Sequence, residues 1–314
     1  MKSKIDAYPG STCASPHKTK EHELAMTIKP IVTAADGSPV SYAAVAWAAQ
    51  VAARRKAPLR ILNSSTLPMI YGSMVAFTQD DYDRVRADGE AILAEAKGVA
   101  QAAVPNSAEL DVTTELVEEA ITPVLIHRSE TAQQIVLGSR GMGAIARTLV
   151  GSVSSGVSRH AKCPVAVIKD DGVEAVLGRT GNVLVGVDGS EAGRPAVAAA
   201  FEEASARGVE LVALHAWTDG SQFRFPDMSF PSVAAEEAAV LSEALAGFAE
   251  NFPDVTVRRI LVRDRPGHNM LEESAKAQLV VVGSRGRGGF AGLLLGSTSQ
   301  ALLHSVECPI LIAR

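Results

Sequence analysis

The sequence predicts an α/β protein built from two doubly wound domains, each with a five-stranded parallel sheet. Three observations support this prediction: a length of 314 residues, a series of apolar segments that occurs twice, and a glycine-rich stretch that also occurs twice. A chain of this length has room for about two domains of ordinary size, and either half can bury its own core. Apolar strands that alternate with helices are typical of a parallel sheet covered on both faces, and right-handed crossovers make it doubly wound.

Each half of the chain contains five short segments with the character of strands. Most are apolar throughout, whereas the third segment of each half alternates polar and apolar residues with a period of two. A Cys-Pro pair begins the fifth segment of both halves. The strands are expected at residues 30–36, 59–64, 110–117, 134–138 and 163–168 in the first half, and at 182–188, 210–217, 255–262, 279–283 and 308–313 in the second.

Four helices are expected between the strands of each half. The first is rich in alanine, and the fourth follows the glycine-rich stretch. The helices are expected at residues 39–56, 80–103, 121–131 and 152–160, and then at 191–207, 232–250, 267–276 and 297–305. Because two copies with the same order of elements are not expected by chance, we interpret the chain as an internal duplication.

The two domains are expected at residues 29–170 and 182–314, joined by a polar, glycine-bearing linker at 171–181. Residues 1–28 are mostly polar, contain two prolines and show no period, so we expect a disordered N-terminal extension. An equally open alternative is an upstream extension of a chain whose fold starts near Met26.

Composition excludes several classes of function. The net charge is −5 and no basic block occurs, which argues against nucleic acid or an anionic membrane as a partner. No apolar run is long enough to span a membrane, and the N-terminus has no apolar core of a secretory signal. The three cysteines (Cys13, Cys163 and Cys308) are too few for a disulfide framework, which fits a reducing cytoplasm.

The glycine-rich stretch GSRGMGAIARTLVGSVS, at 138–154, recurs as GSRGRGGFAGLLLGSTS at 283–299, with a constant offset of 145 residues. It follows the fourth strand and opens a helix, and ligands of open α/β sheets bind beyond the carboxyl ends of strands. Glycine lets backbone N–H groups approach an anion, the helix N-terminus adds positive potential, and the serines add hydroxyl donors. The stretch therefore suits phosphate. The simpler alternative is a tight turn in which Ser152 or Ser297 caps the helix.

Two other phosphate motifs fit less well. No Gly-Lys dipeptide occurs, which excludes the Walker A loop. GMGAIA and GRGGFA match a relaxed dinucleotide pattern, but they follow the fourth strand instead of the first, and no acidic residue ends the next strand.

The spacing Gly-x2-Gly-x9-Gly-Ser, present in both copies, resembles the ATP-binding signature of the universal stress protein family. The Asp-Gly-Ser after the first strand and the Cys-Pro before the fifth are also typical of that family. The resemblance covers residues 29–314. It implies a tandem of two Rossmann-like domains of the adenine nucleotide α-hydrolase type, with strand order 3-2-1-4-5 and pairing of domains through strand five. It also implies ATP as the ligand, with or without Mg²⁺.

In that family the aspartate after strand one contacts the adenine side of the nucleotide, and the glycines and the following hydroxyl hold the phosphates and ribose. The residues of this sequence that match are Asp36, Gly138, Arg140, Gly141, Gly143, Gly151, Ser152, Val153 and Ser154, and then Asp188, Gly283, Arg285, Gly286, Gly288, Gly296, Ser297, Thr298 and Ser299. The first half departs from the pattern: Ala35 stands where the second half has Val187, and only the second half keeps Pro266-Gly267 after strand three.

Simpler roles remain open for several of these residues. Asp36 and Asp188 could cap helices through Asx turns, and the two loop arginines could be solvated. His215 is expected to be a core histidine with satisfied hydrogen bonds, and Cys163 and Cys308 to be small buried residues. No HExxH, no GxSxG and no metal-type Cys/His spacing occurs, so we assign no catalytic residue and no metal ligand.

The function expected from these residues is that of an ATP-binding regulatory or stress-response protein with at most very slow ATP hydrolysis or autophosphorylation. One alternative is an enzyme of the adenine nucleotide α-hydrolase type, which cleaves ATP between its α and β phosphates. Another is a structural dimerisation module with degenerate sites. The expected partners are an adenine nucleotide, a second copy of the chain or an intramolecular pairing of the two domains, and a protein that the sequence does not name.

Overall fold

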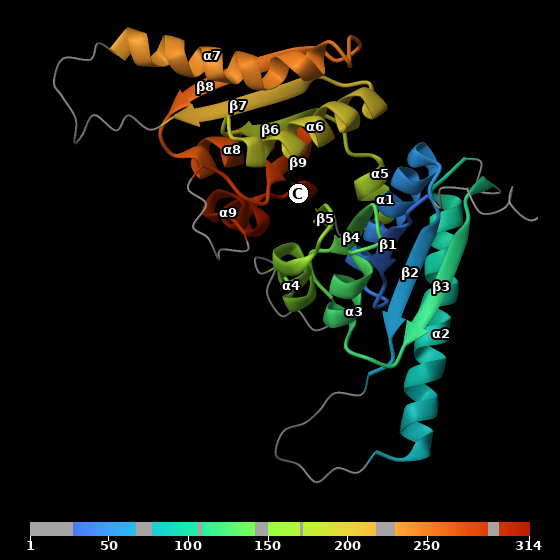
Figure 1. Ribbon diagram of the computed structural model, residues 1–314. Helices are drawn as coiled ribbons and strands as arrows, with labels where there is room; N and C mark the ends of the chain where they lie inside the picture. Colours follow the sequence, from blue (N-terminus) through green and yellow to red (C-terminus); the bar gives the residue numbers. More distant parts are fainter. Residues whose placement is uncertain are drawn as a thin grey trace, which may run out of the picture.

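The computed structural model describes residues 28–66, 77–105, 109–141, 150–169, 172–217, 230–287 and 295–314. The N-terminal extension expected at residues 1–28 lies outside this part except for Ile28. Strands and helices alternate along the chain, and the described strands form one sheet with helices on both of its faces (Figure 1). The predicted fold class is therefore confirmed.

The elements of the first half follow the predicted order with small differences at their ends. They are β1 (Ile31–Ala34), α1 (Pro39–Arg55), β2 (Leu59–Ser64), α2 (Gln79–Ala102), β3 (Val112–Val117), α3 (Ile121–Arg128), β4 (Gln134–Gly138), α4 (Ser152–His160) and β5 (Val165–Ile168).

The second half repeats this order after a short helix. Its elements are α5 (Val173–Leu177), β6 (Asn182–Val187), the 3₁₀ turn η2 (Glu191–Gly193), α6 (Arg194–Arg207), β7 (Leu211–Trp217), α7 (Phe230–Ala249), β8 (Val257–Arg263), α8 (Pro266–Ser274), β9 (Ala277–Gly283), α9 (Ser297–Ser305) and β10 (Ile310–Ala313).

The strands of the sheet lie in the order β3-β2-β1-β4-β5-β10-β9-β6-β7-β8. All pairs within each half are parallel, and each half has the order 3-2-1-4-5 that the family resemblance implies. The halves join where β5 and β10 run antiparallel, with Val165 opposite Ile312 and Val167 opposite Ile310. The expected pairing through strand five therefore occurs within the chain.

Two hydrophobic cores lie on opposite faces of this sheet. Successive strand residues alternate between them: Ile31 belongs to the core under α1, α2, α5, α6 and α7, and Val32 to the core under α3, α4, α8 and α9. Because both faces are covered, the strands are apolar almost throughout. Each core runs across the β5–β10 junction, which makes the two domains one continuous sandwich.

The expected linker contains a helix that the sequence analysis missed. Residues Val173–Leu177 form α5, and Val176 is 6% exposed because it packs into the core beside α1. Five residues are too few to show a helical period, so only the tertiary contact reveals this segment as part of the sandwich.

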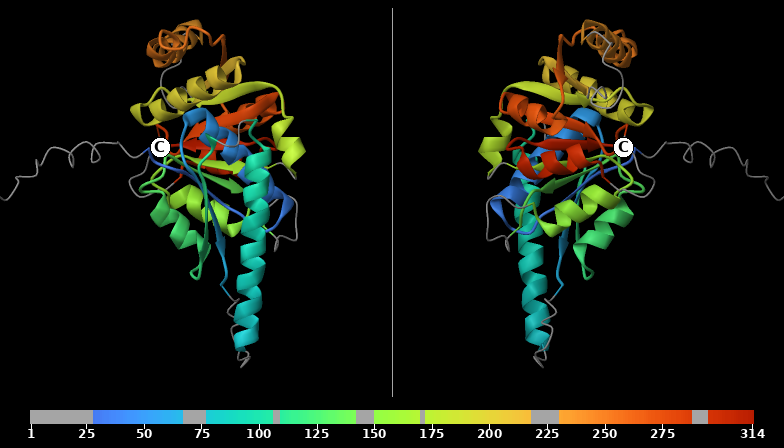
Figure 2. Two further views of the ribbon diagram at one scale, coloured as in Figure 1. Left: turned by 90° about the vertical axis from the view of Figure 1, so that its right-hand side faces the viewer. Right: turned by 90° about the vertical axis from the view of Figure 1, so that its left-hand side faces the viewer.

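Helix α2 extends beyond the ends of β2 and β3 (Figures 1 and 2). A capping box starts it: the Thr78 hydroxyl accepts from the Asp81 N–H, and the Asp81 carboxylate accepts from the Thr78 N–H. Its first buried residue is Gly89, so only its C-terminal half packs on the sheet.

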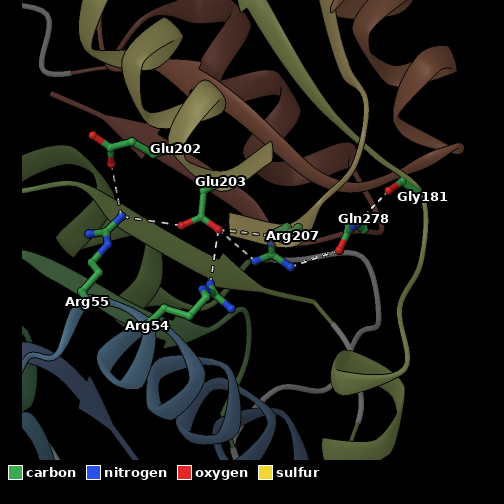
Figure 3. Close-up of polar contacts among 7 residues, drawn as sticks. All are labelled: Arg54, Arg55, Gly181, Glu202, Glu203, Arg207 and Gln278. Carbon is green, nitrogen blue, oxygen red and sulfur yellow. Dashed lines mark hydrogen bonds and ion pairs between the residues drawn. The ribbon is translucent and has the colours of Figure 1, made fainter. Parts of the chain in front are cut away.

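A buried carboxylate joins the domains between α1 and α6 (Figure 3). Glu203 is 3% exposed, and its carboxylate lies 3.0 Å from Arg207, 3.4 Å from Arg54 and 3.6 Å from Arg55. Arg207 also donates to Gln278, whose side chain donates to the Gly181 carbonyl before β6. The chain of contacts thus ties both domains to the segment between them.

Candidate functional site

Two cavities open at the carboxyl ends of the central strands, one in each domain. The first, of about 490 Å³, lies where the strand order reverses between β1 and β4. The second, of about 550 Å³, lies at the corresponding place between β6 and β9. Such a reversal point is where open α/β sheets bind their ligands. We call these cavities site 1 and site 2.

The structure brings the predicted site residues together at these cavities, except for two that lie outside the described residues, Gly143 and Gly288. Site 1 is lined by Asp36, Gly138, Arg140, Gly141, Gly151, Ser152, Val153 and Ser154. Site 2 is lined by Asp188, Gly283, Arg285, Gly286, Gly296, Ser297, Thr298 and Ser299.

Each aspartate uses its two oxygens differently. Oδ1 of Asp36 accepts from the backbone N–H and the hydroxyl of Ser38, at 3.0 and 2.6 Å, and Asp188 accepts from Ser190 in the same way. These are the Asx turns of the simpler interpretation. However, the second oxygen faces the glycine loop: Oδ2 of Asp188 accepts from the Arg287 N–H at 2.9 Å. Asp188 therefore connects the end of β6 with the glycine loop after β9.

The glycines of the loop have different packing surroundings. A Cβ on Gly138 would lie 3.0 Å from Val40 on α1, so this glycine permits close packing of helix and strand. A Cβ on Gly286 would lie 2.8 Å from Oδ2 of Asp188, and Gly141 has the same relation to Asp36. By contrast, a Cβ on Gly296 would lie no closer than 3.7 Å to any described protein atom.

Both helices begin at a glycine with no side-chain cap. The N-cap residues are Gly151 and Gly296, so the simpler alternative, in which Ser152 or Ser297 is the N-cap, does not hold. The hydroxyls of Ser154 and Ser299 donate to carbonyls of their own loops. Their protons are therefore already used, whereas the hydroxyls of Ser152 and Ser297 are exposed beside the cavities.

Positive charge gathers around both loops. Arg140 lines site 1 and repels Lys169 at the end of β5. Burial, with this repulsion, lowers the pKa of Lys169 to about 8. Arg285 lines site 2 and repels Arg314 at the end of β10, where burial again lowers the pKa of the guanidinium. This arrangement favours an anionic ligand at each loop.

Apolar residues that the sequence analysis did not single out complete the cavities. Ile121 and Leu137 line site 1, and Leu214 and Met270 line site 2. Pro266, which the sequence analysis did note, also lines site 2. Ile121 and Pro266 start α3 and α8, Leu137 lies near the end of β4, and Leu214 and Met270 lie within β7 and α8. From the sequence alone, an apolar residue at such a position is expected to belong to the core. Each site thus combines an apolar wall with a polar loop.

The described residues contain no group of three or more His, Cys, Asp or Glu side chains that could hold a metal ion. Within the same ranges, no helix is long and apolar enough to cross a membrane. Cys163 and Cys308 are buried, as expected, and burial raises the pKa of the Cys163 thiol to about 11.

Comparison with known proteins agrees with this architecture. Residues 27–169 and 180–314 each match the Universal stress protein family. One universal stress protein of Mycobacterium tuberculosis is 44% identical over 290 residues, which cover 90% of this chain and 96% of that protein. A second from the same species is 39% identical over 284 residues, with the same coverage.

A solved structure shares the fold. The crystal structure of a universal stress protein from Archaeoglobus fulgidus superposes with a TM-score of 0.65 at 21% identity, and covers 91% of this chain and 98% of its own. The sequence matches and the two repeated domains lead to one conclusion: the chain belongs to the universal stress protein family, as a tandem of two such domains.

Proposed function

We propose that this is a regulatory protein that binds ATP, with one nucleotide site in each domain. The observation that carries the proposal is the glycine at the start of α4 and α9. Gly296 has φ −63° and ψ 149°, which any residue adopts, and Gly151 is nearly identical. A serine there would cap the helix better, and a Cβ on Gly296 would meet no crowded atom. At Gly296 a ligand that approaches the first helical turn explains the glycine, whereas backbone strain does not. At Gly151 a Cβ would also lie 3.3 Å from the Ser139 carbonyl oxygen, so close packing contributes there.

The glycine loop and the helix N-terminus would hold the phosphates. At site 1 the donors are the first backbone N–H groups of α4 and the Ser152 hydroxyl, with Arg140 beside them; Ser297 and Arg285 stand in these places at site 2. An uncapped helix end with nearby cations is a favourable environment for an anion.

The other end of each cavity would hold the adenosine. Ile121 and Leu137 offer apolar surface to a base at site 1, as Val187 and Leu214 do at site 2. Asp36 and Asp188 lie at this place, and a carboxylate can accept more hydrogen bonds than the two of its Asx turn. Since the described residues form no metal cluster, a Mg²⁺ ion would be held mainly by the phosphates, as is usual for this ion.

A thermal unfolding assay tests the proposal. ATP should raise the melting temperature more than AMP does, because the loop acts on phosphates. At a ligand concentration one hundred times above Kd, the gain is about 2.7 kcal/mol per site. No shift with ATP would favour the alternative of a structural module with degenerate sites.

We expect binding without rapid turnover. Aspartates tied into Asx turns at the adenosine end are poorly placed to act as a general base at the γ-phosphate, and even one general base contributes roughly 10²–10⁴-fold. A steady-state assay at saturating ATP should give turnover well below about 1 per second. Turnover of several per second would support the alternative enzyme of the α-hydrolase type.

Partners follow from the same proposal. β5 and β10 pair with each other within the chain. A homodimer would therefore have to form through another surface. A regulatory role in the cytoplasm would act through a protein partner that recognises the nucleotide-bound form.

A further inference from the structure

A closed ring of polar contacts surrounds one end of site 2. His215 lies with Nδ1 2.7 Å from the Val187 carbonyl oxygen and Nε2 2.8 Å from Oε2 of Glu237. The same carboxylate oxygen lies 3.5 Å from Nη2 of Arg287. The backbone N–H of Arg287 donates to Asp188, which follows Val187 directly. The ring therefore joins β6, β7, α7 and the glycine loop.

The histidine in this ring lies between two acceptors. A carbonyl oxygen only accepts, so Nδ1 of His215 carries a hydrogen. A proton must also lie between Nε2 and the carboxyl of Glu237, since two lone pairs at 2.8 Å would repel each other. This proton joins the imidazole, which is 1% exposed, to the carboxyl group of Glu237, and Arg287 lies beside the same carboxyl oxygen.

Site 1 has a different pair at the same two places. Asn63 donates from Nδ2 to the Ala35 carbonyl at 2.7 Å, just as His215 donates to the Val187 carbonyl. Ala35 and Val187 are the residues directly before the two aspartates. Gly89 replaces the glutamate, and a Cβ on it would lie 2.8 Å from Oδ1 of Asn63. Asn63 therefore lies beside Gly89 in the first domain, where His215 lies beside Glu237 in the second.

The neighbouring helix residues establish this correspondence. Ile92, three residues after Gly89, lies against Gly37 of the first turn. Val240, three residues after Glu237, lies against the matching Gly189. In the sequence, Met142 stands where the second loop has an arginine. All three side chains of the ring are therefore replaced together in the first domain.

We propose that Glu237 is a positioning residue of site 2: it holds Arg287 over the aspartate turn and keeps that end of the site ready for the nucleotide. The proposal rests on the nucleotide function proposed above. Arg287 lines site 2, and its guanidinium lies close to the turn after Asp188. A Cβ on Gly189 of that turn, whose φ is +72°, would be only 2.9 Å from the guanidinium. The first domain has no such ring, so we expect site 2 to depend on Glu237 and site 1 not to depend on it.

Charged groups around the pair come from each neighbouring element. Arg287 comes from the loop after β9, and Asp188 from the end of β6. On β8, the partner of His215 is the apolar Leu261, with Arg259 and Arg263 two positions away on either side. Arg287 contacts the Glu237 carboxylate directly, at 3.5 Å.

The test measures ATP affinity at site 2, with site 1 silenced by Gly151→Val. Glu237→Gln should weaken this affinity about tenfold, which is the contribution of one hydrogen bond to a charged group. The matched control is Glu236→Gln, an exposed neighbour on the same helix, which should not change this affinity. With site 2 silenced by Gly296→Val, the ATP affinity of site 1 should not change in Glu237→Gln.

A second readout needs no nucleotide. The ¹⁵N resonances of the His215 ring should shift in Glu237→Gln, which replaces its carboxylate partner, and stay unchanged in Glu236→Gln. The double variant His215→Asn, Glu237→Gly copies the pair of the first domain, so it should fold and should bind ATP at site 2 as weakly as Glu237→Gln does.

The outcomes separate the two proposals. Unchanged site 2 affinity in Glu237→Gln would overturn the positioning role while ATP binding stands. Unchanged His215 ring resonances in Glu237→Gln would overturn the contact between these two side chains. If the wild type binds ATP at neither site, the proposed function fails and this inference fails with it.

Discussion

Lys169 follows β5 and Arg314 follows β10, and each of these side chains contacts the other domain. The Lys169 ammonium donates to the Leu303 carbonyl in the last turn of α9, and Arg314 donates to the Ser158 carbonyl in the last turn of α4. A cation at a helix C-terminus is favourable, and here each one comes from the opposite domain. Each of these helices begins at a glycine loop, so each cation contacts the far end of the helix that starts at the other domain's loop.

The buried Lys169 makes stability depend on alkaline pH. Its pKa falls from 10.5 to about 8, chiefly through burial. Between these two values the unfolded chain binds more protons than the folded one, so the free energy of unfolding rises with pH. Relative to Lys169→Met, the wild type should gain up to about 3 kcal/mol from about pH 8 to about pH 10.5.

Urea unfolding at a series of pH values measures this difference. Lys162→Met removes an exposed lysine near β5, and its difference from the wild type should stay flat. A flat difference for Lys169→Met as well would show that Lys169 keeps an ordinary pKa in the fold.

At the scale of elements, helix α2 holds two glycines with opposite surroundings. Gly98 is exposed, and a Cβ on it would meet nothing within 4 Å. A Cβ on Gly89 would lie 2.6 Å from Leu116 and 2.8 Å from Asn63. Gly98 only weakens the helix. Gly89 makes room for the Asn63 side chain of β2 beside site 1.

Alanine substitutions should therefore change stability in opposite directions. Gly98→Ala should stabilise the protein by about 1 kcal/mol through helix propensity. Gly89→Ala should destabilise it by about 1–3 kcal/mol, because the Leu116 and Asn63 side chains must move to admit the methyl group. Chemical denaturation of both variants checks this. Equal effects would mean that α2 is not packed on the sheet as described.

Elements also show how far the sequence alone could predict the fold and the sites. The strands and the glycine loops were predictable because apolar runs and glycine spacing are local features. Helix α5 was not, since its five residues are fixed by packing against α1. The ring of His215, Glu237 and Arg287 was not predictable either, because its side chains come from three separate elements. His215 was correctly expected to be a satisfied core histidine, but its partner on α7 was not foreseen.

The whole molecule depends on the contact between its domains. Glu203 is buried among three arginines of α1 and α6 (Figure 3). Glu203→Gln should destabilise the protein by about 3–5 kcal/mol, because it leaves three guanidinium groups without their shared carboxylate. Glu202→Gln is the control, since Glu202 is 58% exposed and lies 3.8 Å from Arg55; it should cost less than about 0.5 kcal/mol. Equal, small losses would show that the cluster adds nothing to domain pairing.

The central claim is that one chain carries two nucleotide sites, and titration calorimetry with ATP tests it most directly. The wild type should bind two ATP molecules per chain. Gly151→Val and Gly296→Val should each bind one, and the double variant none, while circular dichroism shows an unchanged fold. A stoichiometry that stays at two in both single variants and in the double variant would contradict the assignment of the glycine loops. A wild type that binds no ATP would contradict the account as a whole.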